Sequence, residues 1–124
     1  MISHLKGTLE HIDKDHITID VNGVGYKVHI TSTVLNKLPR PGTSLNVFTF
    51  QVVRENDISL YGFLSKEERN LFSTLLKVSG VGPKAASAIL SCAPLDKLVS
   101  AIAKGDADLI SSRSEEHTSE LQSR

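Results

Sequence analysis

The stretch HITIDVNGVGYKVHI, residues 16–30, decides how the first half of this chain folds. Apolar residues occupy every second position on both sides of a central Asn22–Gly23 pair, which is the period of a half-buried strand. Asn-Gly is a preferred two-residue connection between strands, because the type I′ turn needs a positive φ at both central residues. The stretch therefore predicts a β-hairpin.

Further strand-like segments extend this hairpin. They lie at residues 4–12, 44–53 and 58–63, with one or two helical turns expected over 31–38 and a Pro/Gly breaker cluster at 39–42. Gly7, inside the first segment, predicts a bulge or a sharp bend. Five short strands with one brief helical link predict an OB-like barrel that is closed or nearly closed.

At Leu64 the pattern changes from strands to helices. Ser65 and Glu68 have the S-x-x-E spacing of a capping box, and a helical apolar face follows, made of Leu71, Phe72, Leu75 and Leu76. A second helix should start at Pro83 with a small-residue face of Ala85, Ala86, Ala88 and Ile89, and a third should follow Pro94. The expected fold class is α+β, with a barrel domain over residues 1–63 and a small all-α domain over 64–112.

The turn SGVGPK, residues 79–84, joins the first two of these helices. Unpaired amides and the positive end of the helix dipole at the start of the second helix make an anion site. Lys84 opposes that dipole at a cost of roughly 0.3–1 kcal/mol, unless a bound phosphate lies between the lysine and the helix. Phosphate binding and an ordinary helix connection with a solvated lysine both remain open from this segment alone.

Composition excludes several classes of function. The 124 residues carry 14 basic and 14 acidic side chains, so no global basic field gathers nucleic acid. The single Cys92, expected to be a small buried residue, excludes a disulfide framework and favours a cytosolic setting. The histidines show no metal-ligand spacing, and the chain has neither a P-loop nor a signal-peptide core. We expect a soluble intracellular protein with no metal site and no cofactor.

The glycine turn resembles the helix-hairpin-helix motif, which holds DNA by its phosphates and does not read bases. The sequence resembles the RuvA family of bacterial Holliday-junction proteins in three segments, residues 21–30, 47–63 and 68–91. The resemblance covers about residues 1–112. It implies an OB barrel that assembles into a homotetramer, binding of four-way junction DNA, and branch migration in recombination and repair. It also implies a hexameric RuvB-type motor and a RuvC-type resolvase as partners, and the bacterial cytoplasm as location.

The resemblance also implies roles for individual residues. The phosphate-binding positions would be Ser79, Gly80, Val81, Gly82 and Lys84. The turn REND, residues 54–57, matches an acidic pin that guides strands at the junction centre, carried here by Glu55 and Asp57. Asn56 stands where the family often has a second adjacent acid. Lys27 and His29 would lie on a strand face turned toward DNA and make weak contacts. Without the resemblance, REND is an ordinary solvated turn and the strand face is solvated too.

The last twelve residues, RSEEHTSELQSR, differ in style from the rest of the chain. They hold no glycine or proline and a single apolar residue, and they look like the translation of a sequencing-adapter oligonucleotide. We expect residues 113–124 to be a non-native tail. The family's second hairpin, of Pro-Gly-x-Gly-Lys type, and its motor-binding domain are then expected to be missing from this chain.

Two other classes of function were weighed against a junction binder. A single-stranded DNA-binding OB module would need aromatic stacking platforms, and the strand region offers only Tyr26, Phe48, Phe50, Tyr61 and Phe63. An enzyme acting on DNA would need a base-flipping pocket with a placed carboxylate, lysine or metal, and no such set is visible. The sequence therefore predicts a non-catalytic DNA-binding subunit, with any ATP hydrolysis in the partner motor.

Overall fold

The computed structural model describes residues 1–92. The chain divides between Arg69 and Asn70 into two compact units, and the predicted boundary near residue 63 stays a prediction. The predicted third helix and the tail at 113–124 lie outside the described residues. In chain order the elements are β1 (His4–Ile12), β2 (His16–Val21), β3 (Val24–His29), α1 (Ser32–Leu35), β4 (Ser44–Arg54), β5 (Asp57–Phe63), α2 (Lys66–Leu75) and α3 (Pro83–Cys92).

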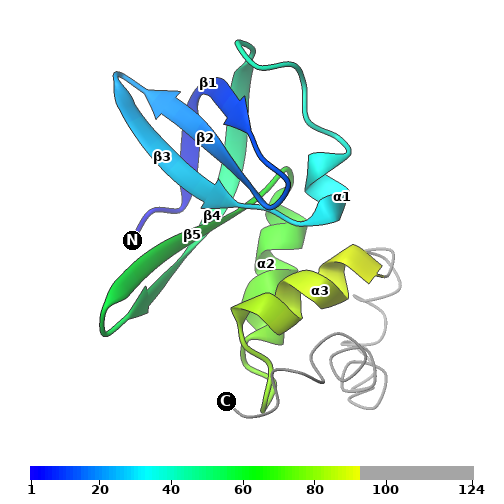
Figure 1. The fold of residues 1–124 in the computed structure, drawn as a ribbon. Coiled ribbons are helices and arrows are strands. Elements are labelled where there is room, and N and C mark those ends of the chain that lie inside the picture. Colours follow the sequence, from blue (N-terminus) through cyan, green and yellow to red (C-terminus); the bar gives the residue numbers. More distant parts are fainter. Residues whose placement is uncertain (93–124) are drawn as a thin grey trace. The chain divides into compact units, whose positions relative to one another are not determined.

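The strands form a closed barrel in the order β1-β2-β3-β5-β4, with β4 pairing back onto β1 (Figure 1). Every pair is antiparallel except β3 with β5, which run parallel over Val28↔Leu60 and His29↔Tyr61. This mixed five-stranded barrel followed by helices confirms the predicted α+β, OB-like fold class.

The β2–β3 hairpin has the predicted turn. Val21 pairs with Val24 across it, and the two loop residues Asn22 and Gly23 have φ values of 53° and 89°. A positive φ at both positions is the signature of the type I′ turn that Asn-Gly favours. This turn sets the pairing of the two strands along their whole length, from Val21↔Val24 out to His16↔His29.

The barrel core is built from the alternating apolar residues of the strands. Leu9, Ile17, Ile19, Val28 and Val47 are fully buried. Burying a side chain of this size contributes about 1.5–3 kcal/mol relative to leaving it exposed. The buried hydroxyl of Thr49 donates a hydrogen bond to the carbonyl oxygen of Ile2 at 2.8 Å, so this polar group is satisfied inside the core.

Gly7 corrects one sequence prediction. The irregularity of β1 lies between Leu9 and His11, and at Gly7 the strand pairs regularly with Leu45. A Cβ at Gly7 would overlap the carbonyl oxygen of Asp20 and lie 2.9 Å from Cγ2 of Val21. A strand glycine marks either a bulge or a close approach of another backbone, and here it is the close approach.

Helix α2 starts at the predicted cap. The amide of Glu68 donates to the hydroxyl of Ser65 at 3.2 Å, which satisfies one of the orphan donors of the first turn. The carboxyl of Glu68 is half-buried, and this burial raises its pKa above the usual value. In the second unit the helices bury Leu71, Phe72, Leu75, Ala85, Ala86, Ile89 and Leu90, whereas Leu76 and Ala88, predicted on the same faces, are only partly buried.

Replacing Ser65 with alanine should lower the free energy of unfolding by about 1 kcal/mol, because the Glu68 amide loses its acceptor. Urea denaturation followed by circular dichroism measures the change. Ser73→Ala is the matched control, since Ser73 lies inside α2, where alanine is the better helix former. An equal loss of stability in both variants would contradict the assignment of Ser65 as the cap.

Candidate nucleic-acid interface

The turn between α2 and α3 is shaped by short backbone hydrogen bonds and one left-handed residue. The Val78 amide donates to the Leu75 carbonyl at 3.0 Å, and the Val81 amide donates to the Val78 carbonyl at 3.1 Å. Gly80 has a φ of +82°, a conformation that residues with a side chain rarely adopt. The chain reverses here because glycine accepts this geometry without strain.

The start of α3 leaves donors available to a ligand. The first helical acceptor is the Gly82 carbonyl, to which the Ala86 amide donates at 2.9 Å. Among residues 1–92, no backbone carbonyl accepts from the amides of Gly82, Lys84 or Ala85. Pro83 has no amide hydrogen and fits the first helical position. Amides without a backbone acceptor at the positive end of a helix are able to bind an anion.

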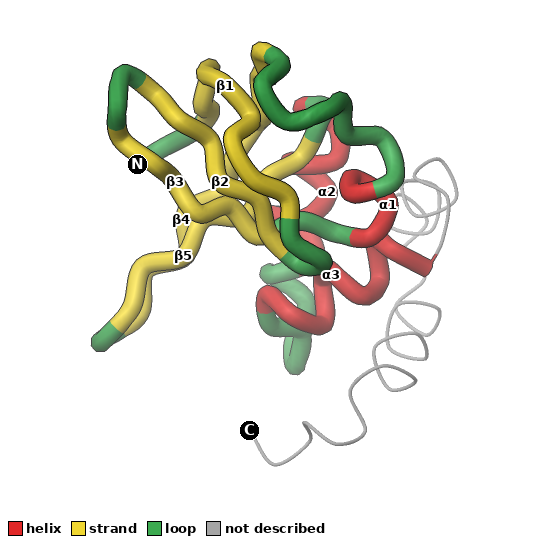
Figure 2. Tube along the Cα trace, turned by 45° about the horizontal axis from the view of Figure 1, so that its top comes forward, coloured by secondary structure: helices red, strands yellow, loops and turns green. Residues whose placement is uncertain are grey.

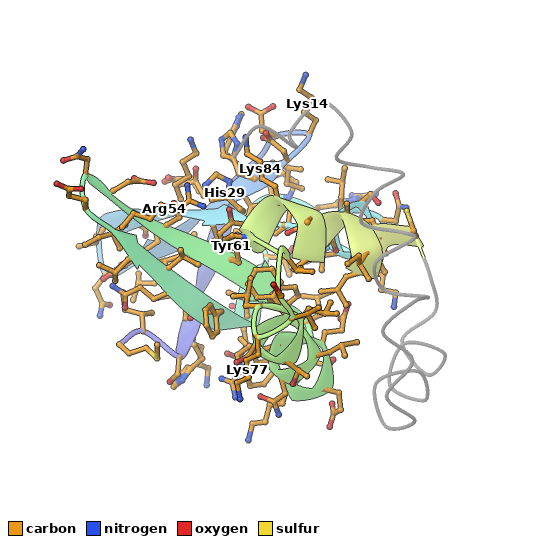
Figure 3. All side chains as sticks on the ribbon, turned by 90° about the horizontal axis from the view of Figure 1, so that it is seen from below. Lys14, His29, Arg54, Tyr61, Lys77 and Lys84 are labelled. Atoms are coloured by element: carbon orange, nitrogen blue, oxygen red, sulfur yellow. The ribbon has the colours of Figure 1, made fainter. Side chains whose placement is uncertain are left out.

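The five predicted turn residues have different surroundings. Ser79, Gly80 and Lys84 are exposed and Gly82 is partly buried. Val81 is 8% exposed and its amide is already used within the turn, so Val81 anchors the turn to the core of the helical unit. Figure 3 shows Lys84 and Lys77 on different sides of this unit. The role of all five in phosphate binding stays a prediction.

The turn predicted as an acidic pin is the tip of the β4–β5 hairpin, which extends beyond the rest of the barrel (Figures 1 and 2). Arg54 pairs with Asp57 across the tip, and Glu55 and Asn56 form the two-residue loop. The Ser59 hydroxyl donates to Asp57 Oδ2 at 2.9 Å, so the Asp57 carboxylate is held by a residue of its own strand. Glu55 is exposed and lies in the loop itself.

Lys27 and His29 lie on β3, two residues apart, and their strand register brings in a third residue. His29 pairs with His16 of β2, with ring centroids 6.4 Å apart in an edge-to-face arrangement. The ring of Tyr61 on β5 lies 5.1 Å from the His29 ring, centroid to centroid (Figure 3). Sequence reasoning missed His16, although a two-residue turn at Asn22–Gly23 already sets position 16 opposite position 29.

The electrostatics of this group follow from burial and neighbouring charge. Partial burial lowers the pKa of His29 below its ordinary value of 6.5, and the nearby Lys27 lowers it further. His16 Nδ1 lies 2.8 Å from Asp15 Oδ1, and this hydrogen bond is the main reason that the pKa of Asp15 is lowered. Burial raises the pKa of Tyr61, so its phenol is neutral throughout the physiological range.

Other features of the described part of the chain bear on function. No three side chains of His, Cys, Asp or Glu in residues 1–92 are grouped so that they could hold a metal ion. No helix within the same residues is long and apolar enough to cross a membrane. Cys92, expected to be buried, is exposed.

Comparison with known proteins identifies related chains. The family model described as RuvA N terminal domain matches residues 1–62. A protein of Pseudomonas entomophila named Holliday junction branch migration complex subunit RuvA is 44% identical over 110 residues, covering 89% of this chain and 54% of the relative. A protein of the same name from Caldanaerobacter subterraneus is 39% identical, covering 89% and 59%. The chain spans about half the length of the curated relatives it matches.

Proposed function

Because this chain belongs to the RuvA family, we propose that it binds four-way DNA junctions without sequence preference, as a non-catalytic subunit that supports branch migration in recombination and repair. The observation that carries the proposal is the turn before α3. It combines the exposed Lys84 with the amides of Gly82, Lys84 and Ala85, none of which donates to a backbone carbonyl within residues 1–92. A phosphate in this turn would accept from the amides and offset the charge of Lys84.

The β4–β5 hairpin tip supports a role at the junction centre. Glu55 is exposed at the end of a protruding hairpin, where its negative charge would repel the phosphate backbone and steer strands apart. Asp57 supplies a second charge, set back from the tip by its bond to Ser59. The pin of this chain therefore relies mainly on Glu55, with Asn56 neutral beside it.

We propose a homotetramer, as the family resemblance implies, and the surface of the same hairpin supports it. Val53 and Ile58 are cross-strand partners that are 67% and 63% exposed, an unusual place for two large aliphatic side chains. In a tetramer with the pins at its centre, neighbouring subunits would cover these residues. A RuvB-type motor and a RuvC-type resolvase are the expected partners of the assembly in the bacterial cytoplasm.

A single-stranded DNA-binding barrel is less well supported. Tyr61 and Phe63 are buried at 9% and 1% exposure, so neither ring face is available for a base to stack on. Phe48 already lies under two cations, because Lys66 Nζ and Arg69 Cζ are each 5.9 Å from its ring centroid.

The proposal is tested by comparing the affinity of the chain for a fluorescent four-way junction and for a linear duplex of equal length at the same salt concentration. We expect tighter binding to the junction, with log Kd rising linearly with log salt concentration, because phosphate contacts release counterions. Competition with an unlabelled single strand should leave the junction bound. Equal affinities for the junction and the duplex would refute the junction assignment.

A further inference from the structure

Three rings from three neighbouring strands of the barrel form a cluster, which we call the histidine cluster: His16, His29 and Tyr61. The His29 ring lies between the other two, with centroid distances of 6.4 Å to His16 and 5.1 Å to Tyr61. His29 is partly exposed, and within residues 1–92 its ring nitrogens make no hydrogen bond. An imidazole that packs against two neighbouring rings, with its nitrogens unused, can take up a proton and donate to an incoming acceptor.

The charges around His29 come from every strand packed against it. Lys27 on β3 and His16 on β2 disfavour the charged imidazole, whereas Asp15 before β2 and Asp57 on β5 favour it. His16 is itself tied to two carboxylates, with Nδ1 2.8 Å from Asp15 Oδ1 and Nε2 3.8 Å from Asp13 Oδ2. His16 therefore has acidic partners of its own, whereas His29 has none in hydrogen-bonding contact.

We propose that His29 is a proton-coupled contact for a backbone phosphate, neutral in the free protein and protonated when the phosphate docks, with His16 as the positioning residue that sets how readily the proton is taken up. The inference rests on the proposed function, since the phosphate is that of the bound DNA. The proton comes from solvent and forms one N–H bond on the imidazole, and no other bond changes. The imidazolium then donates to a phosphate oxygen, while Lys27 supplies a permanent charge on the same strand.

The sign of the pH effect follows from linkage. Burial and Lys27 hold the pKa of free His29 below 6.5, and a bound phosphate raises it, so binding takes up protons between the two values. Affinity for DNA should therefore fall as pH rises through this interval, by up to about tenfold per pH unit for each coupled histidine. Backbone phosphates remain ionised throughout the interval and do not contribute to the change.

The experiment measures the Kd of the chain for a fluorescent four-way junction from pH 5.5 to 8 at constant ionic strength. The wild-type chain should bind progressively more weakly as pH rises, and His29→Gln should flatten the profile. His16→Gln should shift the profile to higher pH, because His16 disfavours the charged imidazole of His29. His11→Gln is the matched control, since His11 is exposed on β1 and lies outside the histidine cluster.

Two results would overturn the inference: a pH profile of His29→Gln equal to that of the wild-type chain, or a His16→Gln profile that does not move. Histidine ring signals in NMR give a second readout. The pKa of His29 should lie below 6.5 in the free protein and rise when junction DNA is added. Absence of junction binding at every pH would instead refute the proposed function, and that outcome is distinct from binding with an unaltered pH profile.

Discussion

Replacing Lys84 with glutamine should weaken junction binding at least about 100-fold at low salt, the largest effect on DNA binding that we expect from a single substitution. Lys84 is exposed in the first turn of α3, beside the amides of Gly82, Lys84 and Ala85. A charge-assisted hydrogen bond contributes about 1.5–3 kcal/mol, and a tetramer would present Lys84 four times. If only some of the four copies contact DNA, removing those contacts therefore weakens the affinity by two orders of magnitude.

The salt dependence gives this prediction a second, independent readout. Each phosphate contact contributes about 0.9 to the slope of log Kd against log salt concentration. Lys84→Gln should reduce that slope, and by about the same amount for junctions of unrelated sequence, because phosphate contacts carry no sequence information. Fluorescence anisotropy across a salt series measures both quantities.

Lys77→Gln is the matched control for Lys84→Gln. Lys77 is an exposed lysine of the same helical unit, follows the end of α2 and lies on a different side of the unit from Lys84 (Figure 3). Its loss changes the net charge equally, so it should lower affinity only slightly. Equal losses in the two variants would mean that bulk charge, and not the turn before α3, holds the DNA.

Replacing Gly7 with alanine should destabilise the barrel by about 3 kcal/mol or more, a large share of the 5–15 kcal/mol typical of a folded domain. The added methyl group would overlap the carbonyl oxygen of Asp20 on β2. This oxygen belongs to backbone held by strand pairing on both sides, since Asp20 pairs with Thr8 of β1 and Gly25 of β3. The clash therefore cannot be relieved by turning a flexible side chain.

Gly25→Ala is the matched control, because a Cβ at Gly25 meets only Cγ2 of Thr18, at 3.4 Å. Gly25 also lies in a barrel strand and pairs with the same Asp20. Urea denaturation of both variants should show a large loss of stability for Gly7→Ala and a change within about 1 kcal/mol for Gly25→Ala. Similar stabilities of the two variants would show that the β1–β2 pair can shift to accept a side chain at position 7.

The fold could be predicted well where neighbouring residues decide the conformation. Asn22 and Gly23 favour a type I′ turn through their own backbone preferences, and the structure has positive φ values at both positions. Ser65 caps α2 and Pro83 begins α3, as their positions beside apolar periodic segments predicted. The five strands follow from period-two alternation, which a half-buried sheet imposes on each strand separately.

Prediction failed or stopped where the outcome depends on residues that are distant in the sequence. Gly7 could mark a bulge or a close approach, and only the position of Asp20 on the next strand decides which. Cys92 lies in an apolar segment yet is exposed. Val81 carries an apolar side chain within a predicted phosphate turn, and its burial shows that it holds the turn in place.

The sequence by itself determined the strands, the caps, the glycine turn before α3 and the family, because each depends on residue types within a few positions of one another. The tertiary structure alone decided which side chains meet across the barrel. The parallel pairing of β3 with β5 brings Tyr61 against His29, and the long β4–β5 hairpin leaves Val53 and Ile58 exposed. The contact between His29 and Tyr61 joins segments about thirty residues apart, and it forms only when the barrel closes and fixes the register of all five strands at once.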